Sequence, residues 1–239
     1  MIGVIVQART GSTRLPGKVL LKSVGKTMLE HLMERLSYCK TPHLAIVATS
    51  IKPQDNPIAE LCQKHGYKLF RGSELDVLDR HYQAARYYEL SVVVRITSDC
   101  PLIDTTLADR IIGFFMDHAG EYDLVTNRHP LTFPDGLDVD VMPISALEHV
   151  WKNATEPHQR EHTIPYFWES GMRVFNFEHP GNLFRKYRWT LDYREDFELI
   201  NAILEGLYHP GSPFAMDDVL AFLERQPDLS AVNARYLPS

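Results

Sequence analysis

The chain has 239 residues, of which 44% are hydrophobic and 23% are charged. This is the composition of a globular protein, and it excludes a disordered chain, a collagen and a coiled-coil rod. The formal net charge of -6 argues against a dedicated DNA- or RNA-binding protein, so we expect no nucleic acid partner.

Apolar runs that suit buried strands alternate with segments of helical periodicity through the first half of the chain. Strands are predicted at 2–6, 44–48, 67–70, 92–96 and 122–126. One helix begins at Thr27 with the capping-box pattern Thr27-x-x-Glu30, and a second covers 56–65. Two more are expected from apolar stripes, the first with Leu75, Leu78, Tyr82 and Ala85, the second with Leu107, Ile111, Phe114 and Phe115. This order predicts an α/β fold with a doubly wound, mostly parallel, Rossmann-like sheet.

The regular alternation ends at Thr126. Residues 127–137 are rich in Pro, His and Gly, and we interpret them as a functional loop. The elements expected after it are a half-exposed strand at 138–141, helices at 145–152 and 158–169, strands at 173–177 and 188–191, a helix with Phe197, Ile200, Leu204 and Leu207 on one face, and a helix at 217–226. We expect a single domain over 1–239, with an inserted subregion at 127–187.

Three widely spaced cysteines, Cys39, Cys62 and Cys100, form no C-x-x-C pair. This predicts a reducing compartment, with no disulfide framework and no thiolate zinc site. The apolar N-terminal run is too short for a signal peptide, and no apolar stretch approaches the ~20 residues of a membrane helix. We therefore expect a soluble, cytoplasmic protein with no membrane partner.

The segment that follows the first predicted strand is cationic. Residues 1–29 contain five basic side chains and no acidic one, although the chain as a whole is acidic. Backbone N–H groups of a Gly-containing turn bind small anions, and residues 7–18 are expected at the carboxyl end of a strand, where open α/β sheets bind ligands. The spacing of Gly11, Gly17 and Lys18 does not fit a Walker A loop, and no G-x-G-x-x-G motif occurs.

This turn resembles the signature loop of the cytidylyltransferases that activate acidic sugars. The matching residues are Arg9-x-Gly11-Ser12-x-Arg14-Leu15-Pro16-Gly17-Lys18. The likeness is to the CMP-KDO synthetase and CMP-acylneuraminate synthetase types, and most of all to the SpsF-like branch of spore coat polysaccharide biosynthesis. Later segments resemble motifs of that branch in the same order, at 70–73, 77–80, 95–103, 134–138, 160–162 and 190–196.

The resemblance implies a nucleotide-diphospho-sugar transferase fold of the GT-A-like type. It also implies a homodimer, with the inserted subregion serving acceptor binding or dimerisation. The implied nucleotide-binding residues are Ala8, Arg9, Gly11, Ser12, Arg14, Lys18, Arg71 and Arg80, of which Arg14 and Lys18 are the candidate catalytic residues. For Arg80 the alternative is an i,i+4 ion pair with Asp76 on an exposed helix face.

Two aspartates are candidates for holding Mg²⁺, the ion that a nucleoside triphosphate brings. Asp99 follows the strand at 92–96 and Asp192 follows the strand predicted at 188–191, so both are expected at the same edge of the sheet as the first turn. Carboxylate oxygens suit Mg²⁺, and the resemblance assigns the metal to the same two residues. The alternative is a helix N-cap, which stays open for Asp192, whereas Asp104 is the better cap beside Asp99.

Asp138-x-Asp140 has the D-x-D pattern of metal-dependent glycosyltransferases. Because Val139 and Val141 alternate with these aspartates, both carboxylates are expected on one face of a strand. Our hypothesis is that this face lines the acceptor sugar site, and a solvated strand face is the alternative.

Residues 158–162 match the zinc motif H-x-x-E-H through His158, Glu161 and His162, but no spacing indicates a third ligand. In the resembled branch, Arg160 and His162 become candidate acceptor-binding residues, since a guanidinium suits a sugar carboxylate. An interhelical ion pair is the alternative for Arg160.

The sequence therefore predicts a Mg²⁺-dependent cytidylyltransferase that transfers CMP from CTP to an acidic sugar and releases pyrophosphate, in surface polysaccharide or glycan biosynthesis. Two alternatives stay open. One is a GT-A-like glycosyltransferase that takes a nucleotide-sugar and binds its metal through Asp138 and Asp140. The other is a non-catalytic nucleotide-binding module.

Overall fold

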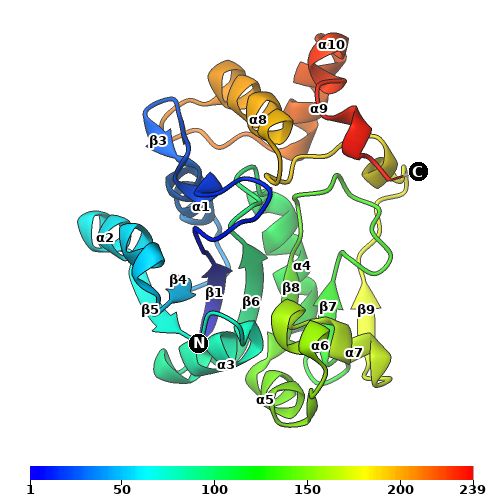
Figure 1. The fold of residues 1–239 in the computed structure, drawn as a ribbon. Helices are drawn as coiled ribbons and strands as arrows, with labels where there is room; N and C mark the ends of the chain where they lie inside the picture. Colours follow the sequence, from blue (N-terminus) through cyan, green and yellow to red (C-terminus); the bar gives the residue numbers. More distant parts are fainter. Residues whose placement is uncertain (239) are drawn as a thin grey trace.

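The computed structural model describes residues 1–238, and its centre is a seven-stranded mixed sheet (Figure 1). In spatial order the strands are β5 (Lys68–Gly72), β4 (Leu44–Ser50), β1 (Ile2–Gln7), β6 (Val92–Thr97), β8 (Asp140–Pro143), β7 (Leu124–Thr126) and β9 (Val174–Asn176). Strand β8 runs antiparallel to both of its neighbours, and the other neighbouring pairs are parallel. The predicted doubly wound, mostly parallel α/β fold is therefore confirmed.

Side-chain alternation along the central strands divides the interior into two cores. In β1, Val4 and Val6 point into one core and Ile5 into the other. The first core is closed by α1 (Met28–Leu36), α2 (Asn56–His65), α4 (Thr105–Asp117), α8 (Arg194–Leu207) and α9 (Met216–Glu224). The second is closed by α3 (Val77–Tyr87), α5 (Ile144–Asn153) and α7 (Pro165–Glu169). In Figure 1, α8 and α9 lie above the strands, and α3 and α5 lie below them.

Two helix starts follow the predicted capping chemistry. The Thr27 hydroxyl accepts the N–H of Glu30, and the Glu30 carboxylate accepts the N–H of Thr27, which completes the capping box of α1. Asp104 caps α4 by accepting the N–H of Leu107 at 2.8 Å. Because Asp104 fills the cap position, the carboxylate of Asp99 is left free for other contacts.

Three predicted elements are wrong in detail. The segment 188–191 is not a strand of the sheet, because its backbone bonds to two loop residues instead: the N–H of Trp189 to the carbonyl of Asp135 at 2.6 Å, and that of Leu191 to the carbonyl of Asp99 at 2.8 Å. The helix predicted at 158–169 is divided into α6 (Pro157–His162) and α7, because the backbone leaves the helical region at Thr163, whose φ is 69°, and Pro165 has no N–H to continue the helical hydrogen bonds. Leu75 is 83% exposed and lies before α3 rather than in its apolar stripe.

The strand predicted at 138–141 is not half-exposed. The strand itself is β8, which begins two residues later, at Asp140, lies between β6 and β7 and is buried on both faces. The segment 127–187, expected as an inserted subregion, supplies β8 and β9 to the main sheet and also carries α5, α6 and α7. None of the helices formed by residues 1–238 combines the length and apolarity needed to cross a membrane.

Candidate active site

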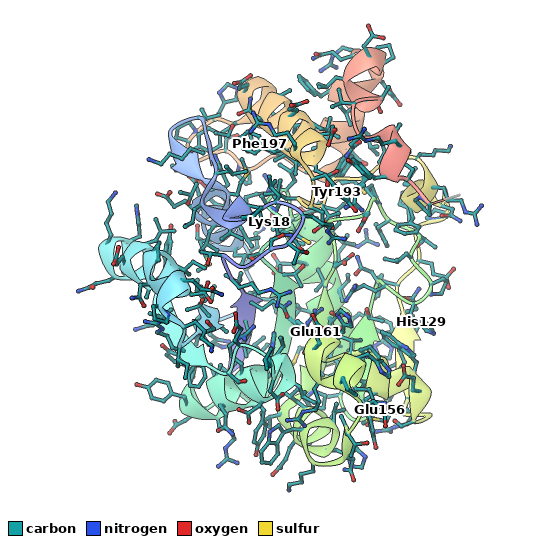
Figure 2. All side chains as sticks on the ribbon, in the orientation of Figure 1. Lys18, His129, Glu156, Glu161, Tyr193 and Phe197 are labelled. Carbon is teal, nitrogen blue, oxygen red and sulfur yellow. The ribbon has the colours of Figure 1, made fainter. Side chains whose placement is uncertain are left out.

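A cleft of about 370 Å³ opens at the carboxyl ends of β1 and β6. The two sides of the cleft include Lys18, from the first turn, and Glu161, from α6, both labelled in Figure 2. Its lining is dominated by charged and polar side chains. The lining residues are Gln7, Ala8, Arg9, Ser12, Thr13, Arg14, Lys18, Val77, Arg80, Arg95, Thr97, Ser98, Asp99, Arg128, Asp135, Asp138, Glu161, His162, Thr190 and Asp192.

The first turn is fixed by a buried aspartate that the sequence did not single out. Asp55 is fully buried and accepts the backbone N–H and the hydroxyl of Thr10, both at 2.7 Å. Burial opposes its charge, but hydrogen bonds from Ser50 and Thr10 lower the pKa of Asp55 below its ordinary value. Gly17 closes the turn with a φ of 68°, a left-handed conformation that glycine adopts without strain, and its N–H donates to the carbonyl of Thr10. The turn therefore presents its cations from a rigid frame.

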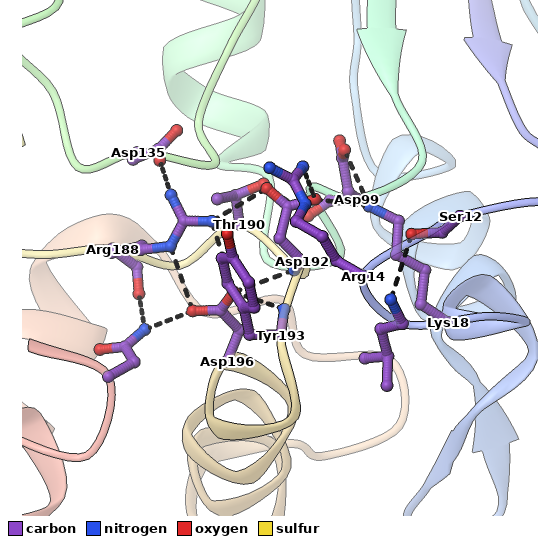
Figure 3. A network of polar contacts seen from close by, with 12 residues as sticks. Ser12, Arg14, Lys18, Asp99, Asp135, Arg188, Thr190, Asp192, Tyr193 and Asp196 are labelled. Carbon is purple, nitrogen blue, oxygen red and sulfur yellow. Dashed lines mark hydrogen bonds and ion pairs between the residues drawn. The ribbon is translucent and has the colours of Figure 1, made fainter. Parts of the chain in front are cut away.

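Lys18 is the buried cation at the centre of the cleft wall (Figure 3). Its Nζ lies 3.2 Å from a carboxylate oxygen of Asp99 and 2.9 Å from one of Asp192. Burial favours the neutral amine, but the two carboxylates outweigh it and raise the pKa of Lys18. Burial likewise opposes the charge of Asp99, yet Lys18 holds the pKa of Asp99 below its ordinary value. Arg14 adds a second cation, with its guanidinium 2.7 Å from Asp192.

The carboxylates of Asp99 and Asp192 meet because of the loop at 188–191. The hydrogen bond from Leu191 to the Asp99 carbonyl places the next residue, Asp192, beside Asp99. Asp192 does not cap α8, whose N-cap is Tyr193, so the N-cap alternative for Asp192 is wrong. Both aspartates that the sequence assigned to the metal line the cleft.

These two carboxylates fit Mg²⁺ in their chemistry, since Mg²⁺ prefers oxygen ligands. No group of three or more His, Cys, Asp or Glu side chains within residues 1–238 is arranged to hold a metal without help. Mg²⁺ commonly takes one or two protein carboxylates and completes its shell with substrate phosphates and water.

The D-x-D pair is divided between two environments. Asp138 lines the cleft, and the Nε of Arg128 lies 2.9 Å from its carboxylate. Asp140 is fully buried beneath the cleft, where it accepts Arg95 at 2.9 Å and the Thr126 hydroxyl at 2.6 Å. The expectation that both residues line the acceptor site is therefore wrong for Asp140. The same burial removes the paired ligands that the glycosyltransferase alternative requires.

The side chains of the H-x-x-E-H motif also lie in different environments. His158 points to Glu169, 2.9 Å away, while Glu161 and His162 line the cleft. The zinc alternative is not supported within residues 1–238, because no third ligand joins the two histidines.

Arg160 lies outside the cleft lining, contrary to its assignment as an acceptor-binding residue. Its Nε donates to Asp76 at 3.1 Å, and its Nη1 donates to the carbonyl of Trp151 at 2.7 Å. Asp76 is the N-cap of α3, so the interhelical ion pair is the arrangement found.

Two of the residues assigned to nucleotide binding do not line the cleft. Arg71 donates to the carbonyls of Ser50 and Lys52 on a different face, and Gly11 lies in the turn without lining the cleft. Arg80, in contrast, is buried at the cleft wall. Its guanidinium donates to the carbonyl of Ser73, and the alternative of an exposed ion pair with Asp76 is wrong.

Several lining residues were missed, and Asp135 is the most informative. Burial and the neighbouring charge of Asp138 raise the pKa of Asp135 to about 7, although Arg188 lies 2.6 Å away and acts in the opposite direction. The local signal was Pro134-Asp135-Gly136, a turn sequence in one of the resembled motifs. Arg95 and Thr190 each begin a resembled motif, at 95–103 and 190–196, whereas Arg128 carried no local signal, because its loop meets the other segments of the cleft only in the folded chain.

Comparison with known proteins agrees with this geometry. The family model described as cytidylyltransferase matches residues 3–213. The chain is 34% identical over 235 residues to the spore coat polysaccharide biosynthesis protein SpsF of Bacillus subtilis, with 94% of each chain covered. It is 30% identical over 177 residues to a 3-deoxy-manno-octulosonate cytidylyltransferase of Acidovorax sp., covering 69% of this chain and 64% of the relative.

Among solved structures, a cytidylyltransferase from Leptospira borgpetersenii superposes with a TM-score of 0.90 at 32% identity, with 95% of each chain covered. The fold and the cleft therefore define a nucleotidyltransferase architecture. Within that class, this chain belongs to the cytidylyltransferase family.

Proposed function

We propose that this protein transfers CMP from CTP to a hydroxyl group of an acidic sugar and releases pyrophosphate. The observation that carries the proposal is the cleft in which Arg14 and Lys18 lie against Asp99 and Asp192. Cations beside metal-competent carboxylates are what a transfer at a phosphate requires. The acidic acceptor is supported by the similarity to a 3-deoxy-manno-octulosonate cytidylyltransferase, and the setting in polysaccharide synthesis by the similarity to SpsF.

The reaction would need little covalent chemistry from the protein. The acceptor oxygen forms a bond to the α-phosphorus of CTP, the bond from that phosphorus to the bridging oxygen breaks, and the hydroxyl proton is released. Arg9, Ser12, Arg14 and Lys18 line the side of the cleft where the triphosphate would lie. In this proposal Arg14 and Lys18 stabilise the negative charge that develops on pyrophosphate, so catalysis comes from positioning and electrostatics.

Asp99 and Asp192 would hold Mg²⁺ in this proposal. Bound there with CTP, the ion would neutralise phosphate charge and make the α-phosphate easier to attack. The chain's own part is to hold the two carboxylates close together through Lys18, which also keeps the pKa of Asp99 below its ordinary value.

The acceptor would bind in the same cleft. Asp138 and His162 line it and can accept or donate hydrogen bonds to sugar hydroxyls. Arg128 is the nearby cation suited to a sugar carboxylate, although it is also paired with Asp138. A homodimer formed through residues 127–187 and a cytoplasmic location, which three unpaired cysteines favour, complete the proposal.

The test is an assay of pyrophosphate release with the purified protein. Each of CTP, UTP, ATP and GTP is supplied with Mg²⁺ and with one acidic sugar at a time, beginning with 3-deoxy-manno-octulosonate. We expect release with CTP and a CMP-sugar product of matching amount. Release that does not depend on an added sugar, or a product carrying another nucleotide, would contradict the proposal.

A further inference from the structure

The C-terminal segment 227–238 reaches the back of the cleft, although it lies beyond residues 3–213, the part of the chain that the family model matches. Most of this segment is exposed or half-buried, but Asn233 is 2% exposed. A buried amide must find hydrogen-bond partners, or its burial costs free energy. The contacts of Asn233 therefore show where the segment is anchored.

Asn233 donates from its Nδ2 to two groups at once. One is the backbone carbonyl of Arg188, and the other is Oδ1 of Asp196, each at 2.8 Å. Asp196 is fully buried at the start of α8. Asn233 itself does not line the cleft.

The two partners of Asn233 are the groups that hold Asp192 (Figure 3). Asp196 accepts the backbone N–H groups of Asp192 and Tyr193 through Oδ2, each at 2.9 Å. The guanidinium of Arg188 donates to Asp192 at 2.9 Å and to Asp196 at 3.2 Å. The backbone and the carboxylate of Asp192 are thus fixed by Asp196 and Arg188, and Asn233 bonds to both of these residues.

The same segment reaches the second cation of the cleft through an aromatic pair. The ring of Tyr236 stacks on that of Tyr193, with centroids 3.8 Å apart and an interplanar angle of 2°. The guanidinium of Arg14 lies 5.3 Å from the centroid of the Tyr193 ring. Two independent contacts therefore link the C-terminal segment to Asp192 and to Arg14.

We propose that Asn233 is a positioning residue, which fixes Asp192 through Asp196 and Arg188 for binding Mg²⁺ together with CTP. This rests on the proposed function, since it assigns Asp192 to the metal. Partners that orient a metal ligand from behind typically change metal affinity by about 10- to 100-fold when removed. The C-terminal segment thereby becomes part of the site without touching the ligand.

The experiment measures CTP binding by calorimetry over a range of Mg²⁺ concentrations, for the wild type, Asn233→Ala and Asn201→Ala. Asn201 is a matched control, because it is a half-buried asparagine of α8 that bonds to Glu205 and does not line the cleft. We expect Asn233→Ala to raise the Mg²⁺ concentration for half-maximal CTP binding about tenfold, with metal-free CTP affinity changed less than twofold. Asn201→Ala should match the wild type in both quantities.

A purely structural role would lower thermal stability without changing the Mg²⁺ dependence of CTP binding, or would weaken CTP binding equally with and without Mg²⁺, and either result would overturn the inference. If Asn233→Ala does not fold, Asn233→Ser carries the same test, because its hydroxyl keeps one donor. Hydrogen exchange of the wild type is a further measurement that needs no variant. Adding Mg²⁺ and CTP must slow exchange at residues 192–193 and in 227–238, and unchanged exchange in 227–238 would contradict the proposal.

The two proposals fail in different ways. A wild-type protein that binds no CTP with Mg²⁺ overturns the proposed function and this inference with it. A wild type that binds, beside an Asn233→Ala variant with unchanged Mg²⁺ dependence, overturns the inference alone.

Discussion

Lys18 is a buried side chain that provides a counter-charge to two acidic residues of the cleft. Its ammonium group lies between Asp99 and Asp192, so neither carboxylate is left buried without a counter-charge. Arg14 differs, because its side chain is 51% exposed and contacts Asp192 from the solvent side. The roles of the two cations can therefore be tested by separate substitutions, because Lys18 contributes to the stability of the fold, whereas Arg14 contributes mainly to the charge of the cleft.

Replacing Arg14 by Ala should reduce turnover without unfolding the protein. A half-exposed ion pair contributes about 0–1 kcal/mol to stability. Removing a group that stabilises developing charge costs about 10²- to 10³-fold in turnover. We expect kcat and kcat/KM for CTP to fall together, with a melting temperature close to that of the wild type. Arg110→Ala, on the exposed side of α4, is the control, and equal turnover in the two variants would contradict the role of Arg14.

Asp135 should make the protein less stable as the pH rises from about 4 to about 7. In the unfolded chain its carboxyl loses its proton near the ordinary pKa of 3.8, whereas in the folded state the pKa is raised to about 7. Between these values the native state holds a proton that the unfolded state has released, so stability falls as the pH rises and is constant above this window.

Asp135→Asn cannot titrate and should lack this decline. The test is urea unfolding of both proteins at a series of pH values. The quantity to compare is the free energy of unfolding of the variant minus that of the wild type. This difference should increase by a few kcal/mol from pH 4 to pH 7. A difference that is constant with pH would show that Asp135 titrates at its ordinary value.

At the scale of elements, the loop 127–137 and the segment 188–191 act as one unit. Asp135 and Trp189 bond through their backbones, and Asp135 also pairs with Arg188. Gly136 makes this close approach possible. Its φ is 110°, and a Cβ built there would lie 2.6 Å from the backbone of Trp189 and of Thr190.

Gly136→Ala should therefore destabilise the protein by more than about 2 kcal/mol, because both the backbone conformation and the contact are incompatible with a side chain. Activity should also fall, since Asp135 and Thr190 line the cleft. Gly113→Ala in α4 is the matched control, since open space surrounds that glycine. It should stabilise the protein by about 0.5–1 kcal/mol. Similar unfolding midpoints in urea for the two variants would contradict this account of the loop.

For the whole molecule, the cleft draws its lining from β1, β6, α3, α6 and four loops. A ligand that binds only the native state stabilises it by a free energy that grows with the logarithm of the ratio of ligand concentration to Kd. At 100 times Kd, CTP with Mg²⁺ should add about 2.7 kcal/mol. For a chain of this size this raises the melting temperature by about 5–11 °C.

Thermal unfolding with each of the four nucleoside triphosphates measures this effect. We expect the largest shift with CTP and Mg²⁺, and removal of the metal by EDTA should reverse most of it. A response that is the same for all four nucleotides would contradict the base selectivity, and a flat response to all of them would contradict the nucleotide site.

The sequence by itself determined the features that depend on neighbours along the chain. Buried apolar runs predicted β1, β4, β5 and β6, and capping residues predicted the starts of α1 and α4, because backbone and cap preferences act over a few residues. The first turn could be recognised for the same reason, since its glycines and cations are contiguous. Asp99 was placed correctly because it directly follows a strand.

Only the tertiary structure decided which charges meet. Asp140 and Arg160 look like site residues in the sequence, yet Arg95 and Asp76 engage them away from the cleft. Asp192 reaches the cleft through the hydrogen bond from Leu191 to Asp99 and through the contacts of Asp196 with Asn233, and not through a strand. The partners in these two hydrogen bonds lie 92 and 37 residues apart along the chain, and the partners in the two ion pairs lie 45 and 84 residues apart. No local periodicity reports contacts over such distances, because they form only when the sheet and both cores bring the segments together.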